Sequence, residues 1–422
     1  MGSILLLLLL QWGCATPLGL IDTADEEPSN QALHGQILVW FSFPQDTRPE
    51  LVQDFERSLQ EAAQEFQNIH ANVNIVIEFF PEEEAIAQFI AQNRQGFGPD
   101  ILYTYNIKVP TLIESGTIRS FAVDQFDLSS YWPETLEHVQ VGDQLYALPV
   151  FLRTQVLCYN RSRVDQPPQT LDQLAEQAKK GYSVGLPSSF AMTAWGVGLF
   201  GGNNASLSKQ VTAWAKWIEW LKDARAAPNI ILSSDTASLS EAFATGNLTY
   251  LACASEEIPL FRQALGQENL GVTFLPHTDQ GKPTPPPRVT VVVFNKASSP
   301  QQATISLRLG RFLTNAEQQK RVILGLQSIA SVNQNVIIDR RLYPIAGTVA
   351  VQSQLNGFLE KYNLSEINEL LLTAEPIYEK AISGEISPGE AAQELQTLII
   401  DIRSRDDLNK NLGHRNNDRP RN

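Results

Sequence analysis

Basic residues are scarce in this chain of 422 residues, which has 32 Lys and Arg against 46 Asp and Glu and a formal net charge of -14. Proteins that bind nucleic acid concentrate positive charge on the binding surface. The only Arg-rich run begins at residue 403, and we assign residues 406–422 to a polar, frayed tail. We therefore expect no nucleic-acid partner.

Common catalytic signatures are also missing. No HExxH, GxSxG, Walker-type or GxGxxG motif occurs, so the marks of hydrolase, nucleotide and dinucleotide sites are absent. The five histidines stand singly, without the spacing of metal ligands. A glycosidase pair of carboxylates stays open, because its members can be distant in sequence. We expect no cofactor, no metal and no catalysis.

The longest early apolar run, at residues 4–10, has seven residues, which is far too few to span a bilayer. It fits the apolar part of a signal peptide, although no Lys or Arg precedes it, which a start codon placed too late would explain. Gly13 and Cys14 follow and resemble the end of a bacterial lipobox. We expect a signal peptide at residues 1–13, a lipid on Cys14 and a polar tether at residues 14–34.

Cysteine is rare, and only Cys158 and Cys253 remain after Cys14. In an exported protein these two could form one disulfide. Each lies in an apolar run typical of a strand, where a free cysteine is commonly buried. We expect two buried thiols.

Strands alternate with helices in the first part of the chain. Strands are expected at residues 37–41, 74–80 and 100–103, separated by helices. The first helix has a capping-box pattern at Thr47 and Glu50, with proline in its first turn. Such alternation is typical of an α/β fold with a mainly parallel sheet and helices on both faces.

The pattern restarts after residue 160. A helix is expected to begin at Thr170, with Gln173 as its capping partner. Further on, a Trp-rich helix carries Trp214 and Trp217 on an apolar face, which we assign to the core. Four further strands are expected at residues 183–186, 248–253, 272–275 and 289–294, and helices dominate from there to about residue 403. The chain is thus predicted to form two α/β units and a helical remainder.

Residues 142–160 lie between the two units. Pro149 interrupts an apolar run there, and proline belongs at a strand entry or a crossing between sheets because it cannot donate to a central ladder. Arg153 is a cation in a mostly apolar run, which is costly unless the charge is solvated or paired, as in a cleft. By itself the segment fits either a hairpin or a crossing between lobes. Its place between two units favours the crossing.

Aromatic and polar residues gather where strands are expected to end. In open α/β sheets, ligands bind beyond the carboxyl ends of strands. The residues at these ends are Trp40, Phe41, Ser42 and Phe43; Tyr103, Thr104, Tyr105 and Asn106; Ser188, Ser189, Phe190 and later Trp195; and Ser255, Glu256 and Glu257. Because aromatic faces beside hydroxyl and amide groups suit a polar small molecule, we expect these ends to converge on one cleft.

Five segments occur together in an order typical of a known family. They are GPDILY (98–103), GDQLYALPVFLRTQVLCYN (142–160), TLDQLAEQA (170–178), EAFATGNLTYLACAS (241–255) and AISGEISPGEAAQELQTLI (381–399). The chain resembles the extracellular solute-binding proteins of ABC importers, in the group similar to maltose-binding protein, over nearly all of residues 36–403. This resemblance implies a two-lobe periplasmic-binding-protein fold of type II, with a ligand cleft between lobes that hinge on crossing segments.

The resemblance also implies a division of the chain and a set of ligand-binding residues. Lobe I would hold residues 35–149 and 288–338, and lobe II residues 150–287 and 339–405. The ligand contacts implied are Ser42, Phe43, Thr104, Tyr105, Asn106, Arg153, Ser189, Phe190, Trp195 and Glu256. At Glu256, sugar-binding members frequently have a stacking Trp. A carboxylate there that faces an arginine would suit a zwitterionic or hydroxyl-rich ligand, or would form a salt bridge that closes the site.

The function implied is capture of a small polar solute, an oligosaccharide or polyol, by a monomeric lipoprotein in the periplasm. The protein would deliver the solute to the transmembrane subunits of an ABC permease. Three alternatives stay open: a cationic ligand such as a polyamine, favoured by Glu256 and Glu257; an exported carbohydrate-active enzyme; and a sensory accessory of a membrane kinase.

Overall fold

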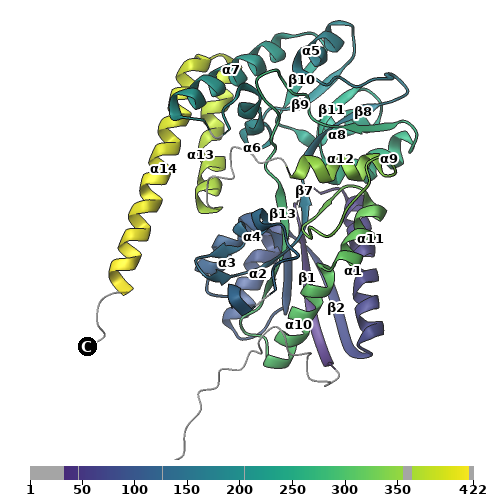
Figure 1. Cartoon of the computed structure of the whole chain (residues 1–422), viewed down its shortest axis with the longest axis vertical. Coiled ribbons are helices and arrows are strands. Elements are labelled where there is room, and N and C mark those ends of the chain that lie inside the picture. Colours follow the sequence, from purple (N-terminus) through teal and green to yellow (C-terminus); the bar gives the residue numbers. More distant parts are fainter. Residues whose placement is uncertain (1–32, 46, 126, 204, 355–363, 418–422) are drawn as a thin grey trace, which may run out of the picture.

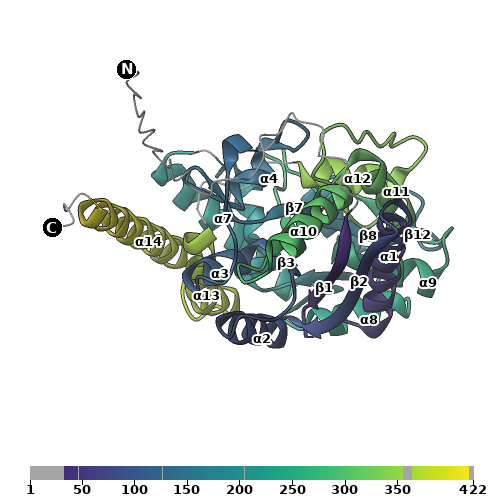
Figure 2. The same cartoon turned by 90° about the horizontal axis from the view of Figure 1, so that it is seen from below.

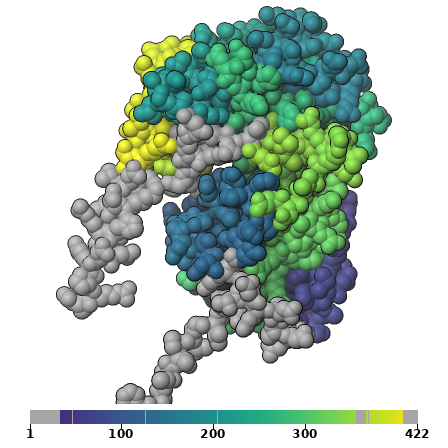
Figure 3. All heavy atoms as spheres, viewed as in Figure 1, coloured from purple at the N-terminus to yellow at the C-terminus, as the bar shows by residue number. Residues whose placement is uncertain are grey.

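The computed structural model describes residues 33–45, 47–125, 127–203, 205–354 and 364–417, which fold into two lobes (Figure 1). The predicted signal peptide, the predicted lipid site Cys14 and nearly all of the predicted tether lie outside the described residues. Each lobe is built around its own sheet. In the space-filling view, the late green segment lies against both the purple and blue first part and the teal second part of the chain (Figure 3).

The strands form one six-stranded sheet, one five-stranded sheet and a small sheet of three short strands. The first has the order β14 (Ala330–Ser331), β7 (Leu148–Arg153), β13 (Arg288–Phe294), β3 (Ile101–Tyr105), β1 (His34–Phe43) and β2 (Asn72–Pro81). The second has the order β10 (Ile230–Ser233), β9 (Val184–Pro187), β11 (Tyr250–Ala254), β8 (Gln155–Asn160) and β12 (Leu270–Thr273). The third has the order β4 (Phe121–Ala122), β6 (Gln144–Leu145) and β5 (Gln140–Val141).

Both large sheets are mixed, so the prediction of a mainly parallel sheet is wrong. Strands β2, β1 and β3 run parallel, as do β10, β9 and β11. Strands β13, β7 and β14 pair antiparallel in the first sheet, and β8 and β12 do so in the second. The local βα alternation does predict the parallel half of each sheet. It says nothing about the strands that pair antiparallel.

Helices cover the sheets. Around the first sheet lie α1 (Pro49–Ile69), α2 (Glu82–Arg94), α3 (Val109–Glu114), α4 (Pro133–Glu137), α10 (Pro300–Leu313) and α11 (Ala316–Leu326). With the second sheet lie α5 (Leu171–Lys179), α6 (Phe190–Thr193), α7 (Leu207–Ala226), α8 (Thr236–Ala244), α9 (Ile258–Leu265), α12 (Pro344–Ser353), α13 (Leu364–Ser383) and α14 (Pro388–Asn417). Short 3₁₀ helices are η1 (Asn106–Lys108), η2 (Val123–Gln125), η3 (Ala194–Phe200) and η4 (Ser255–Glu257).

The helix ends agree with the sequence in part. The predicted capping box of α5 is confirmed, with Thr170 and Gln173 exchanging hydrogen bonds. The predicted box before α1 is wrong: Arg48 is the N-cap residue and has no side-chain cap, while the Thr47 amide donates to Pro44 in a turn. Helix α14 continues through Asn417 and extends away from both lobes (Figure 2), so most of the predicted tail is helical.

The buried apolar side chains form two large cores. One surrounds the first sheet and continues into the second lobe through β8, α8 and α9. The other joins α7, α13 and α14 to the second sheet and contains the fully buried Trp214 and Trp217, as predicted from the apolar face of that helix. The Trp217 indole nitrogen donates to the Tyr378 hydroxyl at 2.7 Å, which satisfies its polar atom inside the core.

The predicted crossing between the lobes is present, but it is displaced along the chain. Pro149 lies inside β7 and does not end it, because the register with β13 shifts at this point and forms a bulge, where a residue without an N–H is tolerated. The chain leaves the first sheet after Arg153 and enters the second sheet at Gln155. Thr154 is therefore the crossing point.

Cys158 and Cys253 form a disulfide, so the prediction of two free thiols is wrong, although both residues are buried as expected. They lie on the paired strands β8 and β11, where Cys158 is registered opposite Leu251, two positions along the strand from Cys253. Their 95-residue separation along the chain hides this proximity.

Removing this cross-link should destabilise the protein. We expect the double variant C158A/C253A to lose about 2–4 kcal/mol of unfolding free energy, because a disulfide restricts the unfolded chain. Urea unfolding with and without dithiothreitol measures the loss. The reductant should shift the wild-type transition and leave that of the variant in place. Equal transitions for both proteins, each indifferent to reductant, would show that the bond is absent in solution.

Candidate functional site

A cavity of about 340 Å³ lies between the two lobes, where strands from both sheets end. The first lobe contributes Phe43 from β1 and Tyr105 from β3. The second contributes Ser189 after β9 and both Glu256 and Glu257 after β11. These strand ends therefore meet at one cavity, as the sequence predicts, because parallel strands deliver their carboxyl ends to the same edge of a sheet.

Arg153 is the last residue of β7, and its side chain lies at this cavity although only 5% of the residue is exposed. Its Nη1 atom donates to the Tyr105 hydroxyl at 2.6 Å. Its guanidinium carbon lies 4.5 Å from the centroid of the Phe55 ring and 5.2 Å from that of Tyr105, at the range of cation–π contacts. Among the described residues, its Nε has no hydrogen-bond partner.

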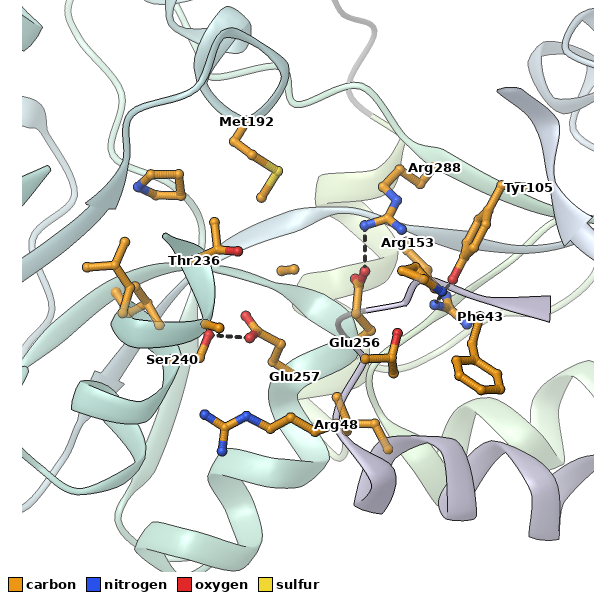
Figure 4. Close-up of a pocket in the computed structure, with 18 of the residues that line it drawn as sticks. Phe43, Arg48, Tyr105, Arg153, Met192, Thr236, Ser240, Glu256, Glu257 and Arg288 are labelled. Atoms are coloured by element: carbon orange, nitrogen blue, oxygen red, sulfur yellow. Dashed lines mark hydrogen bonds and ion pairs between the residues drawn. The ribbon is translucent and has the colours of Figure 1, made fainter. Parts of the chain in front are cut away.

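Arg288 and Glu256 form an ion pair between the lobes. The Nη1 atom of Arg288 lies 2.8 Å from Oε1 of Glu256, and the guanidinium carbon lies 4.9 Å from the centroid of the Tyr105 ring. Burial raises the pKa of the Glu256 carboxyl, but the charges of Arg288 and Arg153 outweigh burial and hold that pKa below its usual value. Figure 4 shows these groups together on one side of the cavity.

Glu257 has the opposite protonation behaviour. Burial, with a smaller contribution from the neighbouring Glu256 charge, raises its pKa to about 7, against the opposing effects of Ser240 and Arg48. The Ser240 hydroxyl donates a hydrogen bond to Oε1 of Glu257. The pKa values of the two adjacent carboxyls thus differ because arginine charges outweigh the burial of Glu256, whereas burial of Glu257 outweighs its hydrogen bond with Ser240.

The remaining walls are hydroxyl-rich and apolar. Ser234, Thr236 and Ser240 line the second-lobe side, and Met192 lies above Thr236 and Ser240 in Figure 4. The Nη2 atom of the lining residue Arg48 lies 2.9 Å from Oε2 of Glu241, which joins the start of α1 to α8. The lobes are therefore linked by ion pairs on both sides of the cavity.

Of the residues predicted to bind ligand, Phe43, Tyr105, Arg153, Ser189 and Glu256 line the cavity. In the first lobe, the buried Ser42 hydroxyl donates to the carbonyl of Tyr103 at 2.9 Å. The buried Thr104 hydroxyl lies 3.4 Å from a Glu82 oxygen, and Asn106 accepts a bond from the backbone of Val289 at 3.3 Å. These three residues hold the strand ends and lie outside the cavity lining.

In the second lobe, Phe190 and Trp195 also lie outside the lining and are buried in the core. Phe190 stacks 5.5 Å from Trp214, and Trp195 packs 5.3 Å from Trp217. The Trp195 indole donates to the carbonyl of Met192 at 2.7 Å. Phe190 and Trp195 therefore anchor in the core the segment after β9 that carries Ser189 and Met192.

Several cavity residues do not follow from sequence reasoning. These are Arg48, Phe55, Met192, Thr236, Ser240 and Arg288. Arg288 had a usable signal, since it precedes an apolar strand just as Arg153 ends one. The sequence predicts that an arginine would face Glu256, and in the structure this arginine is Arg288. Arg153 is close enough to lower the pKa of the same carboxyl. Arg48 and Ser240 come to the same cavity only because the ion pair of Arg48 with Glu241 joins the start of α1 to α8.

The described residues contain no helix long and apolar enough to cross a membrane. Within the same residues, no group of at least three His, Cys, Asp or Glu side chains is placed to hold a metal ion.

A cavity between two sheet-based lobes is typical of proteins that bind a small ligand. Residues 61–339 match the family model described as bacterial extracellular solute-binding protein. This match spans more than half of the chain, and the chain therefore belongs to that family.

Relatives and solved structures agree with this assignment. The galactooligosaccharide-binding protein of Bacillus subtilis (strain 168) is 22% identical over 367 residues, which are 80% of this chain and 85% of that protein. The maltotriose-binding protein of Pyrococcus abyssi (strain GE5 / Orsay) is 28% identical over 152 residues, 35% of this chain and 31% of that protein.

Among solved structures, the GacH receptor of Streptomyces glaucescens GLA.O is similar with a TM-score of 0.69 at 20% identity, covering 88% of this chain and 98% of that one. A cyclo/maltodextrin-binding protein complexed with maltotetraose gives a TM-score of 0.69 at 16% identity, covering 87% and 96%. The fold is the two-lobe periplasmic-binding-protein fold that the sequence predicts.

The Glu257 carboxyl gives the cavity a pH dependence that can be measured. Its folded pKa of about 7 lies above the ordinary value of 4.5, so the native state holds a proton that the unfolded chain releases. The stability it contributes is complete below pH 4.5 and is lost as the pH rises through 7. We expect the unfolding free energy of Glu257→Gln to rise relative to that of the wild type between pH 5 and 8. The expected rise is roughly 1–2 kcal/mol, less than the full pKa shift implies, because solvent screens the cavity.

Urea unfolding at pH 5 and pH 8 measures this gain. Glu176→Gln, on the exposed face of α5, is the control for loss of one carboxylate. A stability difference for Glu257→Gln that does not change with pH would show that this carboxyl is ionised in the folded protein.

Proposed function

We propose that this protein is the solute-binding component of an ABC importer and that it encloses an oligosaccharide or related polyol in the cavity between its lobes. The observation that supports this most is a cavity whose walls come from both lobes, with ion pairs between the lobes formed by residues of its lining. A ligand in that position contacts both lobes only when they close, so it favours the closed state.

The lining favours a carbohydrate. Phe43 offers aromatic surface, and hydroxyls of the second lobe offer donors and acceptors for sugar hydroxyls. Two relatives have names that state the binding of galactooligosaccharide and maltotriose. The proposed ligand contacts are Phe43, Tyr105, Arg153, Ser189 and Glu256.

The remaining predicted ligand residues have a supporting part in this proposal. Ser42, Thr104 and Asn106 fix the strand ends of lobe I, and Phe190 and Trp195 fix the loop of lobe II. Since β7 belongs to the first sheet up to Arg153, we place the first boundary of lobe I after that residue.

Export, lipid attachment at Cys14, a monomeric state and delivery to permease subunits, which the sequence and its resemblance lead us to expect, are part of the same proposal. The arginines of the cavity disfavour a polyamine, because like charges would be brought together there. An enzyme would have to use Glu256 and Glu257, and incubation with oligosaccharides followed by product analysis tests for it. We expect no new products.

Blocking the cavity should abolish ligand binding. Ser189 lies in the lining and makes no side-chain cap to α6, so Ser189→Trp should fill the cavity while preserving the fold. We expect oligosaccharides to raise the wild-type melting temperature, since a ligand at 100 times its Kd contributes about 2.7 kcal/mol. The variant should show no such rise.

The matched control is Ser208→Trp, at an exposed position of α7 outside the cavity. Its ligand-induced shift should equal that of the wild type. If Ser189→Trp binds the same oligosaccharide with unchanged affinity, the ligand site lies elsewhere. If no carbohydrate in a broad panel binds the wild type, the proposed function is wrong.

A further inference from the structure

Positive charge gathers at one side of the cavity in a protein whose net charge is -14. Arg153 and Arg288 both contact the ring of Tyr105, and both lower the pKa of Glu256. Glu256 forms its ion pair with Arg288, at 2.8 Å. The guanidinium of Arg153 instead donates to the phenol hydroxyl of Tyr105 and lies over the rings of Tyr105 and Phe55.

This arrangement is costly for an empty site. A buried cation is normally paired with a carboxylate and has its N–H groups hydrogen-bonded. Arg153 is 5% exposed, and in the described part of the chain its Nε donates to nothing. Cation–π contacts compensate only part of the lost hydration. The planar guanidinium fork matches a carboxylate with two parallel hydrogen bonds, and an incoming carboxylate would supply both the missing charge and the missing acceptor.

The opposite wall has a different chemistry. Ser234, Thr236 and Ser240 present hydroxyl groups there, and Glu257 is bound by Ser240. Such a wall suits neutral hydroxyl groups better than a second anion. The cavity is thus polarised, with guanidinium groups on one side and hydroxyl groups on the other.

We propose that the cavity selects an acidic saccharide, whose carboxylate binds Arg153 beside Arg288 while its ring hydroxyls face Thr236 and Ser240. This inference rests on the proposed function, since it names the kind of carbohydrate that the importer would capture. A uronic acid residue within a short oligosaccharide has the required chemistry. It carries a carboxylate on a ring that also has hydroxyl groups and an apolar face for stacking on an aromatic side chain.

Matched pairs of ligands test the proposal on the full chain. Trimers of galacturonate, glucuronate and mannuronate are each compared with their carboxyl-reduced, neutral counterparts by isothermal titration calorimetry. Within at least one pair, we expect the acid to bind ten or more times more tightly than its neutral form. Raising the salt concentration should lower the ratio of acid to neutral affinity, because salt screens the attraction between the carboxylate and guanidinium charges. Citrate serves as a carboxylate without a sugar ring.

Arg153→Gln should remove most of the acid-to-neutral ratio. Arg341→Gln removes one arginine at an exposed site outside the cavity, where Arg341 pairs with Asp339, and should leave the ratio unchanged. If Arg153→Gln does not fold, the wild-type ratios still decide the question.

The outcomes separate this inference from the proposed function. If neutral trimers bind as tightly as every acid, the carboxylate preference is wrong while the carbohydrate receptor stands. If citrate binds and no saccharide does, the ligand is a simple carboxylate and the proposed function fails as well. If nothing in this panel binds, the acidic-saccharide inference is wrong, and the broad carbohydrate panel described above decides whether the proposed function stands.

Discussion

The arrangement of the site depends on one backbone constraint: Thr154 alone separates β7 of the first sheet from β8 of the second. Its backbone is tied to Ser255, since the Ser255 amide donates to the Thr154 carbonyl at 2.8 Å and the Thr154 amide donates to the Ser255 hydroxyl at 3.2 Å. Arg153 precedes this point and Glu256 follows Ser255. The crossing therefore brings a cation of one lobe and an anion of the other to the same cavity.

The charged residues at the cavity form two kinds of contact: ion pairs that join the lobes, and aromatic contacts of one buried arginine. The pairs of Arg288 with Glu256 and Arg48 with Glu241 join the lobes on both sides. Exposed pairs such as the latter contribute little, about 1 kcal/mol or less, so they allow opening. Arg153 differs from the arginines of these ion pairs because it is buried, and Tyr105 and Phe55 compensate the hydration that its charge has lost. A ligand that compensates this charge would favour closure.

The sequence predicts the strand ends well because alternation and turn residues mark them. It predicts the side chains at those ends less well, because neighbouring residues of a strand point to opposite faces. Phe43 lines the cavity whereas Ser42 lies behind it, and Tyr105 does so whereas Thr104 and Asn106 do not. The disulfide, the bulge at Pro149 and the pairing of Glu256 with Arg288 all depend on contacts between distant segments. Composition and periodicity carry no information about those contacts.

The central claim is that ligand is held between the lobes by residues of both. A crystal structure of the protein grown with the oligosaccharide that stabilises it most would test this directly. The account predicts ligand density in the cavity, in contact with Arg153 and Tyr105 on one side and Thr236 or Ser240 on the other. Density at any other surface, with this cavity holding only water, would contradict it.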